Sequence, residues 1–216
     1  MKYKIVALMV LSLIVSSTAF TACSSKEKSL PKNIICVGDS ITYGYGVSDS
    51  ESYPSVLAQL MGENTQVLNY GVNGATGTSD NAMSYSSLSV YSLCQESEAD
   101  VYVVMLGTND AHEDFWDKEK YLTSMKSMLD AFKLANPNAE IYLMQPPAVF
   151  SSGISDNIIK GELHDAVSHL AKEYKAELID LYAMTKNNEN FFSDGVHPTA
   201  EGYATIAQKI YDAITD

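Results

Sequence analysis

The chain carries the stretch NIICVGDS at positions 33–40, a mainly apolar run followed by a glycine, an acid and a serine. A short run of this kind, closed by a turn signal, is typical of a strand covered on both faces of a parallel sheet. Four further runs have the same length and character, and they lie at 66–70, 101–106, 140–145 and 177–181. The sequence therefore predicts five short buried strands.

Helical patterns separate these runs. Ser52 can cap a helix that has Pro54 in its first turn and Gly62 just past its end. Apolar residues recur every three or four positions in three more segments, at 122–132, 159–174 and, behind a Thr199 cap, 203–213. A further helix is expected at 85–93. Strand–helix alternation repeated five times predicts an α/β protein, a three-layer α/β/α sandwich around a five-stranded parallel sheet.

The first residues have the layout of a secretory signal. Lys2 and Lys4 precede an almost wholly apolar run at 5–15, and small and polar residues follow it. This run is much shorter than the roughly 20 residues that a membrane-spanning helix needs. We therefore expect a signal peptide over residues 1–22.

Cys23 directly follows the predicted signal, in a context that resembles a bacterial lipobox, in which the cysteine is acylated. The sequence predicts a lipid on Cys23, a tether at 23–31, a folded domain at 32–216, and an exported protein anchored to the bacterial cell envelope. An ordinary cleaved signal with an incidental cysteine is the alternative.

Charge and cysteine content exclude several classes of partner. The chain has a net charge of −13 and no arginine, and loss of Lys2 and Lys4 with the signal would take it to −15. Such a chain is a poor ligand for phosphate backbones, so nucleic acid is excluded and membrane contact is expected only through the anchor. Cys36 and Cys94 are predicted to be buried free thiols. No metal or cofactor is expected, and the oligomeric state is left open.

Polar residues follow the predicted strands. Ligands of open parallel sheets bind outside the carboxyl ends of the strands. The groups at these ends are Gly38-Asp39-Ser40, Gly71 to Gly74, Gly107-Thr108-Asn109-Asp110, Pro146-Pro147 and Asp194-Gly195-Val196-His197-Pro198. Four of these five groups carry residue types useful for acyl transfer.

These residue types predict a serine hydrolase. A serine hydroxyl such as that of Ser40 becomes a nucleophile when a base such as His197 removes its proton. Asp194 can reach Nδ1 of that histidine across a tight turn. The Ser40 and Gly74 N–H groups and the Asn109 amide can stabilise an oxyanion. We expect Asp39 and Asp110 to brace their turns.

Four motifs of the chain, in their order, resemble those of the SGNH/GDSL hydrolases: Gly38-Asp39-Ser40, Gly74, Gly107-Thr108-Asn109-Asp110 and Asp194-Gly195-Val196-His197-Pro198. This resemblance implies a flavodoxin-like fold without a cofactor. It implies a catalytic triad of Ser40, His197 and Asp194, with an oxyanion hole formed by Ser40, Gly74 and Asn109.

The resemblance also bears on the substrate. Three stretches, at 107–116, 144–147 and 192–202, resemble the acetylxylan esterase and sialate O-acetylesterase branch of that family. We therefore expect a short-chain, acetyl-specific esterase acting on acetylated carbohydrate or another small ester. His112 and Trp116 are candidate substrate contacts, although a surface position for each is equally open. The alternatives are a lysophospholipase or thioesterase acting on longer acyl chains, and a non-catalytic, glycan-binding surface lipoprotein.

Overall fold

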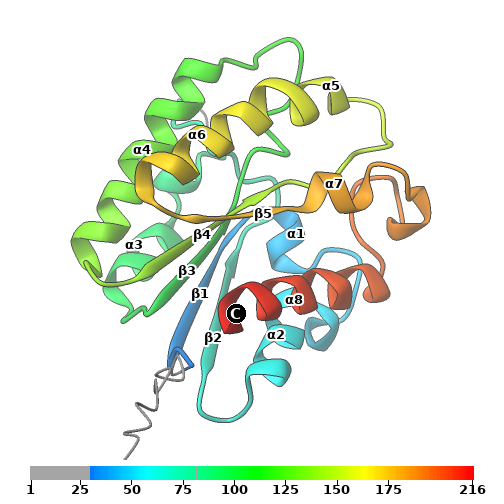
Figure 1. Cartoon of the computed structure of the whole chain (residues 1–216). Helices are drawn as coiled ribbons and strands as arrows, with labels where there is room; N and C mark the ends of the chain where they lie inside the picture. Colours follow the sequence, from blue (N-terminus) through cyan, green and yellow to red (C-terminus); the bar gives the residue numbers. More distant parts are fainter. Residues whose placement is uncertain (1–29, 81) are drawn as a thin grey trace, which may run out of the picture.

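The computed structural model describes residues 30–80 and 82–216. Its sheet has five parallel strands in the order β2-β1-β3-β4-β5, which is the flavodoxin-like order (Figure 1). The strands are β1 (Asn33–Gly38), β2 (Gln66–Gly71), β3 (Val101–Met105), β4 (Glu140–Gln145) and β5 (Glu177–Asp180). The predicted fold class is confirmed, and each strand agrees with its predicted range to within one residue.

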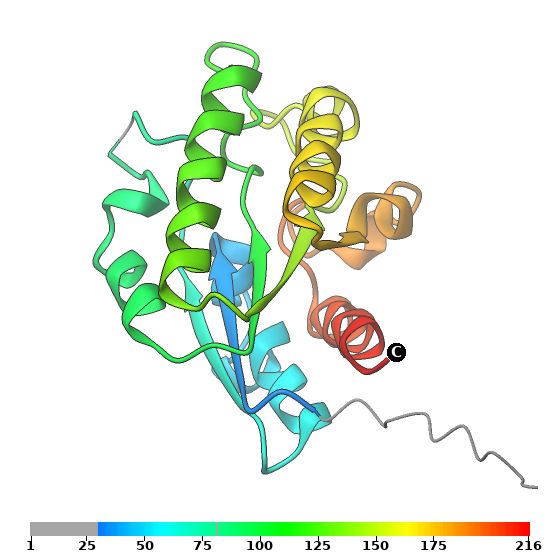
Figure 2. The same ribbon diagram turned by 60° about the vertical axis from the view of Figure 1, so that its left-hand side comes forward.

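Helices cover both faces of the sheet (Figures 1 and 2). One core contains Ile35 and Val37 of β1 and is covered by α3 (Ser89–Glu96), α4 (Lys118–Ala135) and α6 (His164–Tyr174). The other core contains the alternate β1 side chains and is covered by α2 (Tyr53–Met61) and α8 (Ala200–Thr215). Successive strand residues thus enter opposite cores, as the pleat requires.

The remaining elements are short. They are the helices α1 (Ser40–Tyr43), α5 (Asp156–Ile158) and α7 (Leu181–Thr185), the 3₁₀ turns η1 (Asp49–Glu51), η2 (Tyr85–Ser87) and η4 (Glu189–Phe191), and the π-helical segment η3 (Ile159–Leu163).

Helix ends lie where the capping residues predict them. Ser52 is the residue before α2, and Gly62 ends that helix with a φ of 80°. The Thr199 hydroxyl accepts a hydrogen bond from the Gly202 N–H at the start of α8. Local signals therefore fix these boundaries.

Three details differ from expectation. Strand β2 lies at the sheet edge, so none of its residues is fully buried. The helix predicted at 85–93 is the turn η2, a break at Leu88 and then α3, because the buried Tyr85 hydroxyl donates to the Tyr70 carbonyl and holds the turn apart. The helix predicted over 159–174 contains the π-helical segment η3.

The predicted buried thiols are present. Cys36 and Cys94 are both free and buried, and burial raises the pKa of Cys94 to about 11. Thiols in such surroundings are unreactive.

The predicted signal peptide, the lipidated Cys23 and most of the tether lie outside the described residues and stay predictions. No helix in the described part of the chain is both long and apolar enough to span a bilayer.

Candidate active site

Ser40 sits at a sharp turn between β1 and α1. Asp39 precedes it, and the Asp39 Oδ1 atom caps α1 by accepting the Ile41 N–H at 2.9 Å. A side chain at Gly38 would overlap the Thr42 hydroxyl and the Met105 carbonyl, so the turn requires glycine there. The turn places the Ser40 side chain at the carboxyl edge of the sheet.

A chain of hydrogen bonds links Ser40 to two residues that are far away in sequence. The Ser40 Oγ lies 2.9 Å from Nε2 of His197, across 157 positions. The Nδ1 atom of His197 lies 2.7 Å from Oδ2 of Asp194. The sequence predicted these three residues to meet, and the structure brings them together.

A tight turn fixes the Asp194 carboxylate. Its Oδ1 accepts the N–H groups of Val196 and His197 at 3.0 and 2.8 Å, and Gly195 between them has a φ of 83°. Partial burial acts to raise the pKa of Asp194, but the hydrogen bonds from His197 and Val196 outweigh it and lower the pKa. The carboxylate is therefore held ionised against the imidazole.

Hydrogen bonds join the loop after β2 to the loop after β3. The Asn109 side-chain amide donates to the Ala75 carbonyl at 3.0 Å. Asp110 accepts the Gly77 and Thr78 N–H groups, both at 2.8 Å, and the Thr78 hydroxyl at 2.6 Å. The expected bracing role of Asp110 is confirmed, because it ties the loop after β3 to the loop after β2.

Gly74 and Asn109 line one cavity of about 470 Å³. Met83 and Phe115 supply its apolar wall, and both are well exposed, at 40% and 62%. The remaining lining residues are Thr76, Thr78, Asp80, Asp110 and Lys120. Ser40, Asp194 and His197 line neither this cavity nor a larger one, of about 660 Å³, near the amino ends of β4 and β5.

The two candidate substrate contacts, His112 and Trp116, have different neighbours. The His112 ring stacks on Phe115 with ring centroids 4.6 Å apart. The Trp116 indole N–H donates to Glu162 at 2.7 Å, and its ring packs on Tyr121. Phe115, rather than Trp116, lines the cavity beside Asn109, and sequence reasoning had not separated these two neighbours.

Sequence reasoning also missed Tyr45. Its ring lies against the His197 ring, with centroids 4.4 Å apart and an interplanar angle of 43°. The position of Tyr45, five residues after Ser40, does not by itself predict a contact with a histidine near the other end of the chain.

Asp39 lies under the site. Its carboxyl group is fully buried, and Oδ2 has no hydrogen-bond partner in the part of the chain that the structure describes. Burial raises the pKa of Asp39 to about 6, against the opposing effect of the Ile41 N–H. Asp39 braces the turn, as expected.

This arrangement can carry out acyl transfer. A hydroxyl, an imidazole and a carboxylate form one chain, which can move a proton from the hydroxyl to the imidazole.

Among residues 30–80 and 82–216, no group of three or more His, Cys, Asp or Glu side chains could hold a metal ion.

Comparison with known proteins supplies the family. Residues 36–205 match the GDSL-like Lipase/Acylhydrolase family. The chain is 28% identical to an acetylxylan esterase from Xylanibacter ruminicola, over 84% of this chain but only 42% of that protein. It is 24% identical to an arylesterase from Vibrio mimicus, over 86% of this chain and 90% of the relative.

Solved structures show the same fold. A carbohydrate acetylesterase family member from Sinorhizobium meliloti superposes with a TM-score of 0.66 at 20% identity, over 85% of this chain and 97% of that one. The chain belongs to the GDSL-like Lipase/Acylhydrolase family, and it is a carboxylic ester hydrolase.

Proposed function

We propose that the protein hydrolyses esters through Ser40 as nucleophile, His197 as general base and Asp194 as the residue that orients the base. The observation that carries the proposal is the continuous hydrogen-bond chain, 2.9 Å from Ser40 to His197 and 2.7 Å from His197 to Asp194. The first distance lies within the range that proton transfer requires, and the second is that of a strong hydrogen bond that orients the imidazole.

The reaction has two halves. The Ser40 Oγ attacks the ester carbonyl carbon and gives its proton to Nε2 of His197. The N–H groups of Ser40 and Gly74 and the Asn109 amide stabilise the oxyanion. The carbon–oxygen bond then breaks, and the leaving alcohol takes the proton from His197. Water enters by the same route and releases the acid from the acyl-enzyme.

The substrate that we favour is a short-chain ester, an O-acetyl group on carbohydrate. The acetylxylan esterase relative supports this assignment, although this chain spans less than half of that protein. The predicted export supports it too, because polymeric carbohydrate lies outside the cytoplasm.

A specific observation favours a second candidate, hydrolysis of longer acyl chains. The cavity next to Gly74 and Asn109 is about 470 Å³ and has Met83 and Phe115 on its wall. An acetyl group would fill only a small part of that volume. A medium-length acyl chain would bury apolar surface there, at about 0.8 kcal/mol for each CH₂ group.

Replacement of Ser40 tests the mechanism. We expect Ser40→Ala to lower kcat by about 10⁴-fold or more while the melting temperature changes little. A serine-directed fluorophosphonate should label the wild-type protein and not the variant. Turnover at the wild-type level in Ser40→Ala would exclude the mechanism, and an unlabelled, inactive wild-type protein would favour a glycan-binding lipoprotein without catalysis.

Acyl length separates the two candidate substrates. Esters of one alcohol with acyl chains of two, four, eight and twelve carbons should be compared by kcat/KM. The acetylated-carbohydrate assignment predicts a maximum at two carbons and release of acetate from acetylated xylan. A maximum at eight or more carbons would instead support the second candidate, and Met83→Trp should then lower that maximum by filling the cavity.

We further propose that the protein is exported and lipid-anchored through Cys23. The support is the sequence alone, namely the apolar run at 5–15 and the lipobox-like residues before the cysteine. Radiolabelled palmitate should enter the wild-type protein and not Cys23→Ala. Equal labelling of both proteins, or of neither, would contradict lipidation at this residue.

A further inference from the structure

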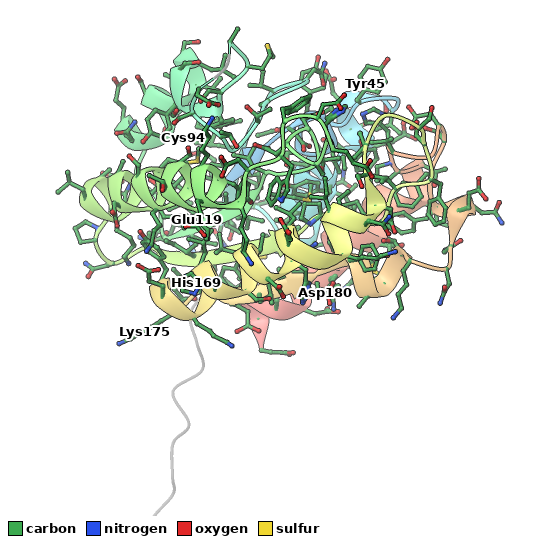
Figure 3. All side chains as sticks on the ribbon, turned by 90° about the horizontal axis from the view of Figure 1, so that it is seen from above. Tyr45, Cys94, Glu119, His169, Lys175 and Asp180 are labelled. Carbon is green, nitrogen blue, oxygen red and sulfur yellow. The ribbon has the colours of Figure 1, made fainter. Side chains whose placement is uncertain are left out.

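Tyr45 presents an exposed aromatic ring directly beside the proposed catalytic base. Its side chain is 49% exposed, and its ring lies 4.4 Å from that of His197. Figure 3 shows Tyr45 among the loops at one end of the molecule, with Lys175 at the opposite end. Half of the tyrosine surface therefore remains available next to the imidazole.

The backbone of Tyr45 is fixed at both of its polar groups. Its N–H donates to the Ser40 carbonyl at 3.0 Å, and its carbonyl accepts the hydroxyl of the buried Tyr203 at 3.0 Å. The flanking Gly44 and Gly46 have φ angles of 95° and 88°, which favour glycine. Because these contacts fix the backbone, the Tyr45 ring can contact a ligand with little loss of conformational entropy.

The chemistry of ester cleavage decides which part of a substrate this ring would meet. When the carbon–oxygen bond breaks, its electron pair stays on the alcohol oxygen, which takes a proton from Nε2 of His197. That oxygen must therefore lie within hydrogen-bond reach of Nε2, about 3 Å. The alcohol part of the ester consequently lies on the His197 side of Ser40.

The acyl part lies away from the base. It stays attached to Ser40 after the alcohol has left, and Gly74 and Asn109, the proposed oxyanion donors, belong to loops other than the one that carries His197. The two halves of an ester therefore meet different surfaces of the protein.

We propose that Tyr45 is the contact surface for the alcohol half of the substrate, and that its ring selects an alcohol with a flat, extended face, such as a pyranose. The ring offers a large, rigid area with a polar tip, which suits a ligand that has both apolar and hydroxyl surface. This inference rests on the proposed function, because it takes His197 as the acid that releases the alcohol.

A different role would explain the same contact. Tyr45 could serve only to hold the His197 ring in place. In that case its loss would slow both halves of the reaction, since His197 acts in acylation and in deacylation alike. A substrate contact affects acylation only, and by an amount that depends on the alcohol.

The experiment compares acetyl esters that differ only in their alcohol. Tyr45→Leu, Tyr45→Phe and the wild-type protein are assayed with ethyl acetate and with an acetylated xylopyranoside. Hydrolysis of the acetyl-enzyme is measured separately, after a burst with 4-nitrophenyl acetate. Tyr43→Leu is the matched control, because Tyr43 is 51% exposed on the same segment, next to β2, where its carbonyl accepts from Asn69.

We expect Tyr45→Leu to lower kcat/KM for the xylopyranoside by about tenfold or more, and that for ethyl acetate by less than about threefold. Deacylation should keep its wild-type rate, and Tyr45→Phe and Tyr43→Leu should stay within about threefold of wild type on both esters.

Two results would overturn the inference. Equal losses on both esters together with slower deacylation would assign Tyr45 to the orientation of His197 alone. Unchanged kinetics in Tyr45→Leu would remove any role in binding. Neither result bears on the proposed mechanism. An active Ser40→Ala variant would contradict that mechanism instead.

Discussion

The two sides of the proposed site are built in different ways. On one side, Asp194 and His197 lie three residues apart in a single tight turn. Three short hydrogen bonds to the Asp194 carboxylate stabilise this turn. On the other side, Asn109 and Gly74 come from loops after different strands, and the hydrogen bonds that join these loops span 32 to 34 positions. The first side is a local structure, whereas the second depends on the whole sheet.

Under the proposed mechanism, one side serves proton transfer and the other serves charge stabilisation. The local turn fixes the distance between a carboxylate and an imidazole, which sets the tautomer and orientation of the proposed base. The paired loops fix where donors lie relative to a third residue, which sets how well an oxyanion is stabilised. Substitutions that damage each side separately should therefore give kinetic losses of different size and kind.

The largest loss is expected on the local side. Asp194→Asn removes the charge that orients His197, and kcat should fall by about 10³–10⁴-fold. The Asn109 side is unaffected, so KM should stay near its wild-type value. The pH dependence of kcat/KM should also change, because an ionised carboxylate no longer faces the imidazole. An unchanged pH–rate profile would show that Asp194 does not act on His197.

A smaller loss is expected on the side formed by the paired loops. Asn109→Ala removes one oxyanion donor, and kcat should fall by about 10²–10³-fold. The hydrogen bond to Ala75 is lost as well, so the melting temperature must be measured beside the rate. A fall of less than about threefold in kcat, with the fold intact, would contradict the assignment of Asn109 as a donor.

The smallest kinetic effect is expected beneath the two sides, at Asp39. The side-chain oxygen that remains in Asp39→Asn can still accept the Ile41 N–H, so kcat/KM should stay within about threefold of wild type. Stability should respond instead. The pKa of Asp39 is raised from 3.8 to about 6, so the unfolded chain loses this proton first as the pH rises. Between these values the wild-type protein loses stability, on the order of 3 kcal/mol.

Urea unfolding at pH 4 and pH 7 checks this sign. The free energy of unfolding of Asp39→Asn should exceed that of the wild-type protein at pH 7 and approach it at pH 4. A variant that is less stable than wild type at pH 7 would show that the buried carboxylate stabilises the turn.

The sequence predicts the local side more fully than the other. The spacing of Asp194, Gly195 and His197 contains all the information that a tight turn needs, and the strand pattern brings the turn to the rim of the sheet. The same reasoning places the ends of α2 and α8, whose capping residues lie next to the helices that they end.

Contacts between distant segments could not be predicted in this way. The stacking of Tyr45 on His197 and the packing of Trp116 on Tyr121 depend on how loops fold over one another. The π-helical segment is a further case, because the Gln145 amide donates to the Ile159 carbonyl across two elements. Hydrophobic periodicity describes which face of a segment is buried and carries no information about such pairs.

The direction of β1 has a consequence for where the enzyme can work. The strand begins at Asn33 and delivers Ser40 at its far end, roughly 20 Å away at about 3.3 Å for each residue. Anything that holds the protein through the residues ahead of this strand therefore attaches at the pole opposite the reactive serine. Under the proposed anchoring, the tether and the lipid therefore leave the end of the domain that carries Ser40 unobstructed for a substrate.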